Sequence, residues 1–217
     1  MSKILTPSKE LFLKYGVYSG AIAPTRGLIS HWPGKMNGNT VIDLLGERHG
    51  TAYNVTTTPG KRGDALNFNG SDAYVDFTSY DFSGDATLAF WIYLKAAMPA
   101  GPAAIVMGDG YALGAGTLSN KIRIWKYSAP DKSYNFSFNE WHLVIYKKIG
   151  STVYLKIDNA VIESWSNPAN FGIWKFGRHF WNGTWRYTNG YLNLVRLYEV
   201  ATTDVEDTML WNYGNAI

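Results

Sequence analysis

The sequence of 217 residues contains no cysteine. Disulfide bonds, thiolate metal sites and cysteine nucleophiles are therefore excluded, and the fold depends on its apolar core. The sequence also lacks an apolar run that approaches the roughly 20 residues needed to cross a bilayer. We therefore expect no membrane insertion.

Charge is sparse and is not concentrated in one region. Charged residues make up 17% of the chain, the formal net charge is +3, and the longest basic runs are pairs such as Lys61-Arg62 and Lys147-Lys148. A nucleic-acid-binding protein gathers its cations along one strip, where they displace counterions. We therefore expect no nucleic-acid partner.

Familiar catalytic motifs are missing. None of the four histidines belongs to a His-Glu-x-x-His motif, and no Gly-x-Ser-x-Gly elbow occurs. Gly108, Gly110 and Gly114 do not have the spacing of a dinucleotide-binding loop. We predict no catalytic residue.

Aromatic residues are concentrated instead, in one short stretch. Seven lie between Phe171 and Tyr187, accompanied by Lys175, Arg178 and Arg186. Aromatic rings can bind the C–H faces of sugars while polar groups fix the orientation. They can equally fill a core or bury against another protein chain. All three interpretations remain open at this point.

A second aromatic pair extends the candidate platform. Trp125 and Tyr127 share the alternation phase of Lys121 and Arg123, so we expect them to face away from the core. The candidate residues for binding a glycan or a protein are Trp125, Tyr127, Trp174, Arg178, Trp181, Trp185 and Tyr187.

Alternating apolar residues dominate the chain after Gly27. The pattern has period two in the stretches 87–94, 121–127 and 153–158, as expected for strands with one buried face. Turn-forming residues such as Asn69-Gly70 and Asn189-Gly190 separate these stretches. Many short strands at this spacing predict an all-β fold, an antiparallel two-sheet jelly-roll sandwich.

Residues 1–26 read as an N-terminal arm. Pro7 suits the first turn of a short helix and Gly16 its end. Leu11, Phe12 and Tyr15 would share one face of that helix, and so short a helix needs a surface to lie on. They are candidate assembly contacts, and the surface is either their own domain or a neighbouring subunit.

A short helix is predicted near the C-terminus. Thr203 and Glu206 form a capping-box pattern. Val205, Met209 and Leu210 would make its apolar stripe, and Gly214 would end it.

Several stretches, in order, resemble the laminin-G-like branch of the concanavalin A-like lectin/glucanase superfamily. They are Gly-Leu-Ile-Ser-His-Trp-Pro at 27–33, Val-Ile-Asp-Leu-Leu-Gly at 41–46, Gly-Asp-Ala-Leu-Asn-Phe-Asn-Gly-Ser at 63–71, Phe-Asn-Glu-Trp-His-Leu-Val at 138–144 and Tyr-Leu-Asn-Leu-Val-Arg-Leu-Tyr at 191–198. The resemblance implies two antiparallel sheets, one of them concave, over residues 27–217. It also implies a structural role for His142, which lies in a core strand of the family.

The chain departs from this family pattern at functional positions. Asn193 stands where members usually carry Asp, and no glutamate begins the Glu-x-Asp-x-x-Glu motif of the glucanases. The loop after Asp43 lacks the acids and amides that could help hold calcium in relatives. Calcium could still use turn aspartates, but we favour turn stabilisation and predict no cofactor. The aspartates considered are Asp43, Asp72, Asp76 and Asp109.

We therefore predict a non-catalytic interaction module. The favoured interpretation is a structural, decorating or adhesion subunit of a larger assembly such as a phage virion, oligomeric and in contact with other protein subunits. The alternative is a lectin-like module that binds polysaccharide through an aromatic platform, and a glycoside hydrolase ranks third. Residues 1–10 contain no uninterrupted apolar stretch, so we expect a virion or other extracellular surface reached without a secretory signal peptide.

Overall fold

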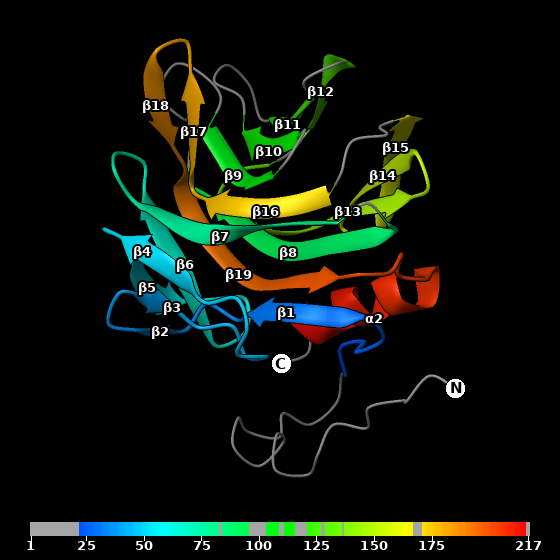
Figure 1. Cartoon of the computed structure of the whole chain (residues 1–217), viewed down its shortest axis with the longest axis horizontal. Coiled ribbons are helices and arrows are strands. Elements are labelled where there is room, and N and C mark those ends of the chain that lie inside the picture. Colours follow the sequence, from blue (N-terminus) through cyan, green and yellow to red (C-terminus); the bar gives the residue numbers. More distant parts are fainter. Residues whose placement is uncertain are drawn as a thin grey trace.

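Two antiparallel β-sheets stack face to face, with one helix near the C-terminus (Figure 1). This arrangement, in a computed structural model, confirms the predicted β-sandwich. The structure describes residues 22–82, 84–95, 103–108, 111–115, 121–126, 129–135, 137–166 and 171–215. No helix in these ranges is long and apolar enough to cross a membrane.

The first sheet has eight strands in the order β15-β14-β13-β8-β19-β6-β5, and β1 also pairs with β19. Its strands are β1 (Leu28–Trp32), β5 (Thr56–Pro59), β6 (Asp64–Asn69), β8 (Ala86–Leu94), β13 (Trp141–Ile149), β14 (Thr152–Ile157), β15 (Ala160–Ser166) and β19 (Asn189–Tyr198).

The second sheet has nine strands in the order β12-β11-β10-β9-β16-β7-β4-β3-β2. Its strands are β2 (Met36–Asn37), β3 (Thr40–Val41), β4 (Gly50–Tyr53), β7 (Tyr74–Phe82), β9 (Ala103–Gly108), β10 (Tyr111–Ala115), β11 (Lys121–Lys126), β12 (Ala129–Asn135) and β16 (Phe171–Phe176). A separate hairpin of β17 (Arg178–Trp181) and β18 (Thr184–Tyr187) rises beside β7 and β16 (Figure 1).

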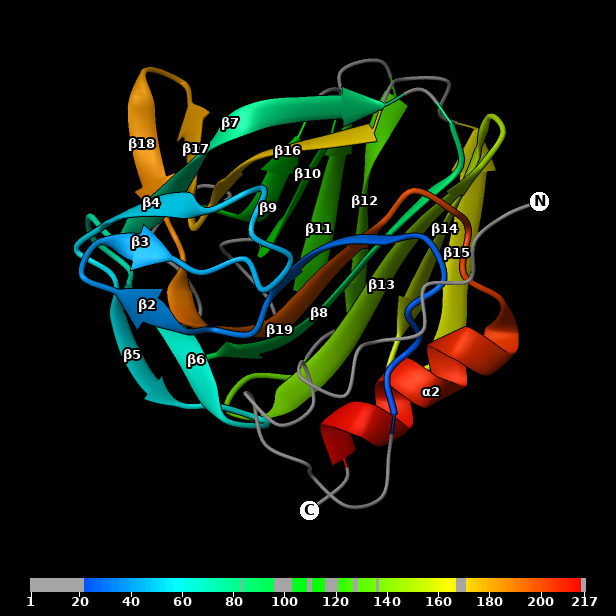
Figure 2. The ribbon, with the colours of Figure 1, turned by 60° about the horizontal axis from the view of Figure 1, so that its bottom comes forward.

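The core lies between the two sheets. Leu88, Phe90, Ile92 and Leu94 of β8 are all fully buried there, as their alternation predicts. Trp91, on the other face of β8, is buried as well, because α2 (Asp204–Asn215) lies against the outer face of the eight-stranded sheet (Figure 2). Period two alone could not reveal this second layer.

The capping box of α2 is formed as predicted. The Thr203 N–H donates to Glu206 Oε2 at 2.8 Å, and the Glu206 N–H donates to Thr203 Oγ1 at 3.2 Å. Two details of the prediction were wrong. Val205 is 71% exposed. Gly214 lies within the last turn, where an added Cβ would come within 2.2 Å of the Trp91 ring.

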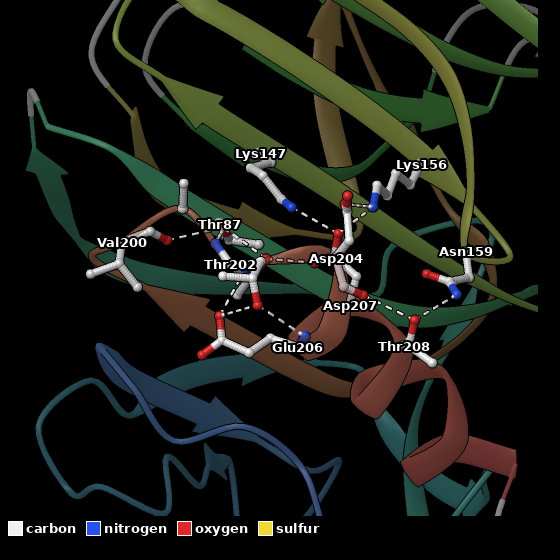
Figure 3. Close-up of polar contacts among 12 residues, drawn as sticks. Thr87, Lys147, Lys156, Asn159, Val200, Thr202, Asp204, Glu206, Asp207 and Thr208 are labelled. Carbon is white, nitrogen blue, oxygen red and sulfur yellow. Dashed lines mark hydrogen bonds and ion pairs between the residues drawn. The ribbon is translucent and has the colours of Figure 1, made fainter. Parts of the chain in front are cut away.

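A buried carboxylate fastens α2 to the sheet. Asp207 is completely buried and accepts hydrogen bonds from Lys147 Nζ at 2.7 Å and Lys156 Nζ at 2.5 Å (Figure 3). Thr202 Oγ1 donates to its other oxygen at 2.6 Å. Asp204, at the surface, pairs with Lys156 as well. The inner face of the helix is therefore held by charge as well as by Leu210, the residue of the expected apolar stripe that is fully buried.

The last residues of the predicted arm contact the sandwich. The carbonyl of Pro24 accepts a hydrogen bond from the Tyr198 hydroxyl, and Arg26 forms an ion pair with Glu206 at 2.7 Å. The candidate assembly contacts Leu11, Phe12 and Tyr15 lie outside the described residues.

Candidate functional site

The outer face of the nine-stranded sheet carries a stack of tyrosines. Val75 and Phe77 of β7 face the core, so Tyr74 and Asp76 point outward. Tyr53 of β4 is the register partner of Tyr74. Their rings stack with centroids 4.5 Å apart and planes inclined by 14°. The exposed fraction of Tyr53 is 43%, so this end of the stack faces solvent.

Arg178 continues the stack across to the β17–β18 hairpin. Its guanidinium carbon lies 3.3 Å from the ring centroid of Tyr74 and 4.2 Å from that of Trp185. Trp185 in turn meets Phe180 edge to face at 5.1 Å. Cations bind favourably over aromatic faces, so the guanidinium holds the two groups of rings together. The five residues form what we call the aromatic column: Tyr53, Tyr74, Arg178, Trp185 and Phe180.

One carboxylate orients the cations beside the column. Asp76 Oδ1 accepts from Lys175 Nζ at 2.8 Å, and Asp76 Oδ2 pairs with Arg178 at 3.1 Å. All three side chains retain some solvent exposure, so these pairs add little stability. Their effect is geometric, since they fix charged donors and an acceptor next to ring faces.

The local sequence explains the hairpin. Asn182 and Gly183 at its tip both have positive φ, of 46° and 78°. Two such residues form the turn that matches the twist of paired strands. Phe180 and Trp185 are then register partners, which brings them onto one face. Gly177, with φ of 87°, lets the chain leave β16 against the Phe68 ring, where a Cβ would clash.

Several predicted site residues meet at this place. Arg178 and Trp185 belong to the column, and the ring of Tyr187 lies 6.5 Å from that of Tyr74. Trp174 is half-buried on β16, next to Lys175.

The remaining predicted residues cannot be placed in the site. Trp125 belongs to β11 and Trp181 to β17, but their side chains lie outside what the structure describes. Tyr127 lies outside the described residues altogether.

The site residues predicted from the sequence did not include Tyr53, Tyr74 or Phe180; Lys175 was noted only as a neighbour of the aromatic stretch, and Asp76 was considered only for calcium. One signal was available, because Tyr74 and Asp76 flank the apolar Val75 and must share the outward face. Nothing in the sequence indicated that β4 and the hairpin lie beside them.

The aspartates considered for calcium have other partners. The carboxylate of Asp43 accepts hydrogen bonds from three backbone N–H groups at 2.7 to 3.2 Å, which fixes its turn. Asp72 binds two asparagine amides, and Asp76 binds two cations. Asp109 lies outside the described residues. Within those ranges no group of three histidine or acidic side chains is arranged to hold a metal ion.

His142 connects two elements of the eight-stranded sheet. Its Nδ1 lies 2.6 Å from Asp158 Oδ2, and its Nε2 lies 3.1 Å from the Ser137 hydroxyl. Asp158 also accepts the backbone N–H of Leu143, so the group ties β13 to the turn after β14. Burial lowers the pKa of His142, but the hydrogen bond and the charges of Asp158 and Glu140 outweigh burial and raise it.

Comparison with known protein families identifies the fold. The family model described as the concanavalin A-like lectin/glucanases superfamily matches residues 69–206. The chain therefore belongs to this superfamily, as the sequence motifs predicted. A comparison with curated proteins finds no match.

Solved structures share the fold at low sequence identity. A sialidase of Trypanosoma rangeli in complex with sialic acid aligns with a TM-score of 0.72 and 16% identity, over 88% of this chain and 34% of that one. Domain 4 of AbnA, an extracellular arabinanase of Geobacillus stearothermophilus, in complex with arabinotriose, aligns with a TM-score of 0.68 and 16% identity. The alignment covers 84% of this chain and 97% of that domain. The binding domain of botulinum neurotoxin DC in complex with SialylT aligns with a TM-score of 0.64 and 14% identity, over 87% of this chain and 52% of that one. This chain spans about a third of the sialidase.

Proposed function

We propose that the protein is a non-catalytic carbohydrate-binding module and that glycans bind at the aromatic column. The observation that carries the proposal is Arg178 held between the rings of Tyr74 and Trp185, with exposed rings at both ends of the stack. Ring faces bind the C–H surfaces of sugars, and convergent polar groups fix their hydroxyls. Lys175, Arg178 and Asp76 provide those donors and the acceptor.

The chemistry of the column favours binding over hydrolysis. Most glycoside hydrolases use two carboxyl groups on either side of the scissile bond. Among the described residues, Asp76 is the carboxylate in contact with the column, and it is bound to Lys175 and Arg178. A general acid would need a second carboxyl group there.

The structural neighbours support a saccharide ligand. Domain 4 of AbnA, which aligns over 97% of its length, was solved with arabinotriose, and a sialidase that aligns over a third of its length was solved with sialic acid. These likenesses concern the fold, so the choice of sugar is left to the experiment.

Affinity electrophoresis tests the proposal. Gels containing arabinan, xylan, mixed-linkage glucan, polygalacturonate or hyaluronan should include one that retards the full chain. On that gel, Trp185→Ala should weaken binding about tenfold, equivalent to about 1.4 kcal/mol. Val205→Ala is the control, because Val205 is exposed on α2, which packs against the eight-stranded sheet and not against the sheet that carries the column. A wild-type chain that no polysaccharide retards would contradict the proposal.

We further propose, as a second candidate, that the module works as a subunit of a larger assembly at a virion or other extracellular surface. The supporting observation is that Pro24 and Arg26 fix where the arm leaves the sandwich, beside the first turn of α2. Native mass spectrometry of the full chain and of a variant lacking residues 1–21 tests this. Oligomers of the full chain that the shortened variant also forms would contradict a docking role for the arm.

A further inference from the structure

A second aromatic group lies on the outer face of the eight-stranded sheet, on the other side of the sandwich from the column. Trp141 of β13 and Tyr191 of β19 are both register partners of Tyr93 on β8. The ring of Tyr93 lies 5.6 Å from that of Trp141 and 5.2 Å from that of Tyr191. We call Trp141, Tyr93 and Tyr191 the aromatic row.

Polar side chains continue the same line across the sheet. Tyr191 is the register partner of Asn67 on β6, and Asn67 is the partner of Thr56 on β5. The Asn67 amide donates to Thr56 Oγ1 at 2.9 Å. Lys95 Nζ donates to Asn67 Oδ1 at 3.0 Å and lies 4.4 Å from the centre of the Tyr191 ring. Amide, hydroxyl and ammonium groups are therefore ordered at one end of the row.

Helix α2 stops short of the row. Trp91, two residues before Tyr93 on β8, is fully buried against Gly214 and Trp211 in the last turns of the helix. Tyr93, by contrast, keeps part of its surface in solvent, as do Trp141 and Tyr191. The outer face of the eight-stranded sheet is therefore buried under α2 at Trp91 but remains partly exposed at the row.

We propose that the aromatic row is a second glycan-binding surface, which takes an extended polysaccharide chain running across the strands. This inference rests on the proposed carbohydrate-binding function and adds a site on the opposite face. Because the line crosses five strands spaced about 4.8 Å apart, it is about 19 Å long. That length suits several consecutive sugars better than a single one.

The composition of the line favours a glycan over a protein partner. Its five register positions hold three aromatic rings, an amide and a hydroxyl, without an aliphatic side chain. The centre of a protein interface is also rich in Trp and Tyr, but it is depleted of lysine, whereas here Lys95 lies over the Tyr191 ring. Stacking rings next to hydrogen-bonding groups are instead the combination that sugar rings require.

Two measurements on the full chain test the row separately from the column. In affinity electrophoresis on the polysaccharide that retards the wild type, Tyr191→Ala should weaken binding roughly tenfold. The double variant with Trp185→Ala should bind more weakly than either single variant, and Val205→Ala should bind normally. In fluorine NMR of protein labelled with 5-fluorotryptophan, the Trp141 signal, assigned from Trp141→Phe, should move when a hexasaccharide of that polymer is added.

The NMR titration is made in the Trp185→Ala background with the row intact, and Trp141→Phe serves only to assign the signal. A Trp141 signal that saturating hexasaccharide leaves unmoved would overturn the row and leave the column standing. Weaker binding in Tyr191→Ala but not in Trp185→Ala would retain the row and overturn the column. Absence of binding to every polysaccharide would overturn both. A Trp141 signal that the hexasaccharide moves only after removal of residues 1–21 would show that the arm occupies the row in the full chain. That result would overturn the row as a glycan-binding surface of the full chain.

Discussion

At position 193 the hydrogen-bond partners of the side chain favour Asn over the similar residue Asp. Asn193 is fully buried in β19, and its amide nitrogen donates to the carbonyls of Pro33 and Asp64, at 2.6 Å each. Its oxygen accepts the backbone N–H of Arg62 at 3.0 Å. An ionised aspartate could not donate, and it would face two carbonyl oxygens. The departure from the family's usual Asp therefore fits the surroundings of this chain.

Asn193→Asp should lower the free energy of unfolding by roughly 3 kcal/mol at neutral pH, because a buried carboxylate would keep one donor, the Arg62 N–H, and would face the carbonyl oxygens of Pro33 and Asp64. Urea denaturation measures the loss, which should shrink as the pH falls and the carboxyl group protonates. Asn37→Asp, on the exposed β2, should stay within about 0.5 kcal/mol of the wild type. Equal effects of the two variants would contradict this explanation.

At Arg178 the flat shape of the guanidinium matters more than its charge. Arg178→Lys keeps the charge beside Asp76 but loses the flat guanidinium between the rings of Tyr74 and Trp185. We expect glycan affinity to fall about tenfold, or about 1.4 kcal/mol, with the fold intact. Isothermal titration calorimetry measures the glycan affinity, and Lys175→Arg is the control that exchanges the same two residue types in the opposite sense. Unchanged affinity in Arg178→Lys would show that charge alone suffices.

At the scale of elements, α2 is attached differently from a typical amphipathic helix. Its inner face presents Asp207 to Lys147 and Lys156, two lysines on the outer face of β13 and β14 (Figure 3). Breaking such a buried pair is far more costly than the pair's net contribution, because the remaining charges are left without a partner. The helix is therefore specified by charge as well as by Leu210.

Asp207→Asn should reduce the free energy of unfolding by roughly 3–5 kcal/mol, since the buried Lys147 ammonium loses its counter-ion and the buried Lys156 ammonium keeps only the exposed Asp204. Chemical denaturation measures this, and near-UV circular dichroism reports the stacked pair of Trp91 and Trp211. Asp204→Asn is the control, because its side chain is 91% exposed and its pair with Lys156 contributes at most about 1 kcal/mol. A loss under 1 kcal/mol for Asp207→Asn would contradict the argument.

At the scale of the whole molecule, the sequence was sufficient to predict the sandwich. It was not sufficient to predict which residues meet on the outer faces of the two sheets. Alternation placed Leu88 and Phe90 in the core, and the capping pattern placed the start of α2. The burial of Trp91 depends on a helix more than a hundred residues away, which local periodicity cannot report. The column is likewise made by strand pairing, which joins Tyr53 and Trp185 through residues distant in sequence.

His142 makes the free energy of unfolding of the whole sandwich depend on pH. The folded protein raises the pKa of His142 above its usual 6.5, so protonation of His142 stabilises the fold. That contribution is fully present below about pH 6.5 and is lost as the pH rises through the folded pKa. The unfolding free energy of the wild type minus that of His142→Gln should therefore decrease from about pH 6.5 upward. Urea titrations at several pH values measure it, and a difference that rises with pH would contradict the prediction.

The β17–β18 hairpin has a consequence for how this scaffold diversifies. It contributes three of the five column residues, yet it forms a two-stranded unit of its own with a tight turn at Asn182 and Gly183. Changes in its length or side chains leave the hydrogen-bonded ladders of both large sheets untouched. For the glycan-binding role proposed for the column, exchange of this one hairpin is therefore a route by which natural variation or engineering can change ligand choice while the two large sheets keep their strand order.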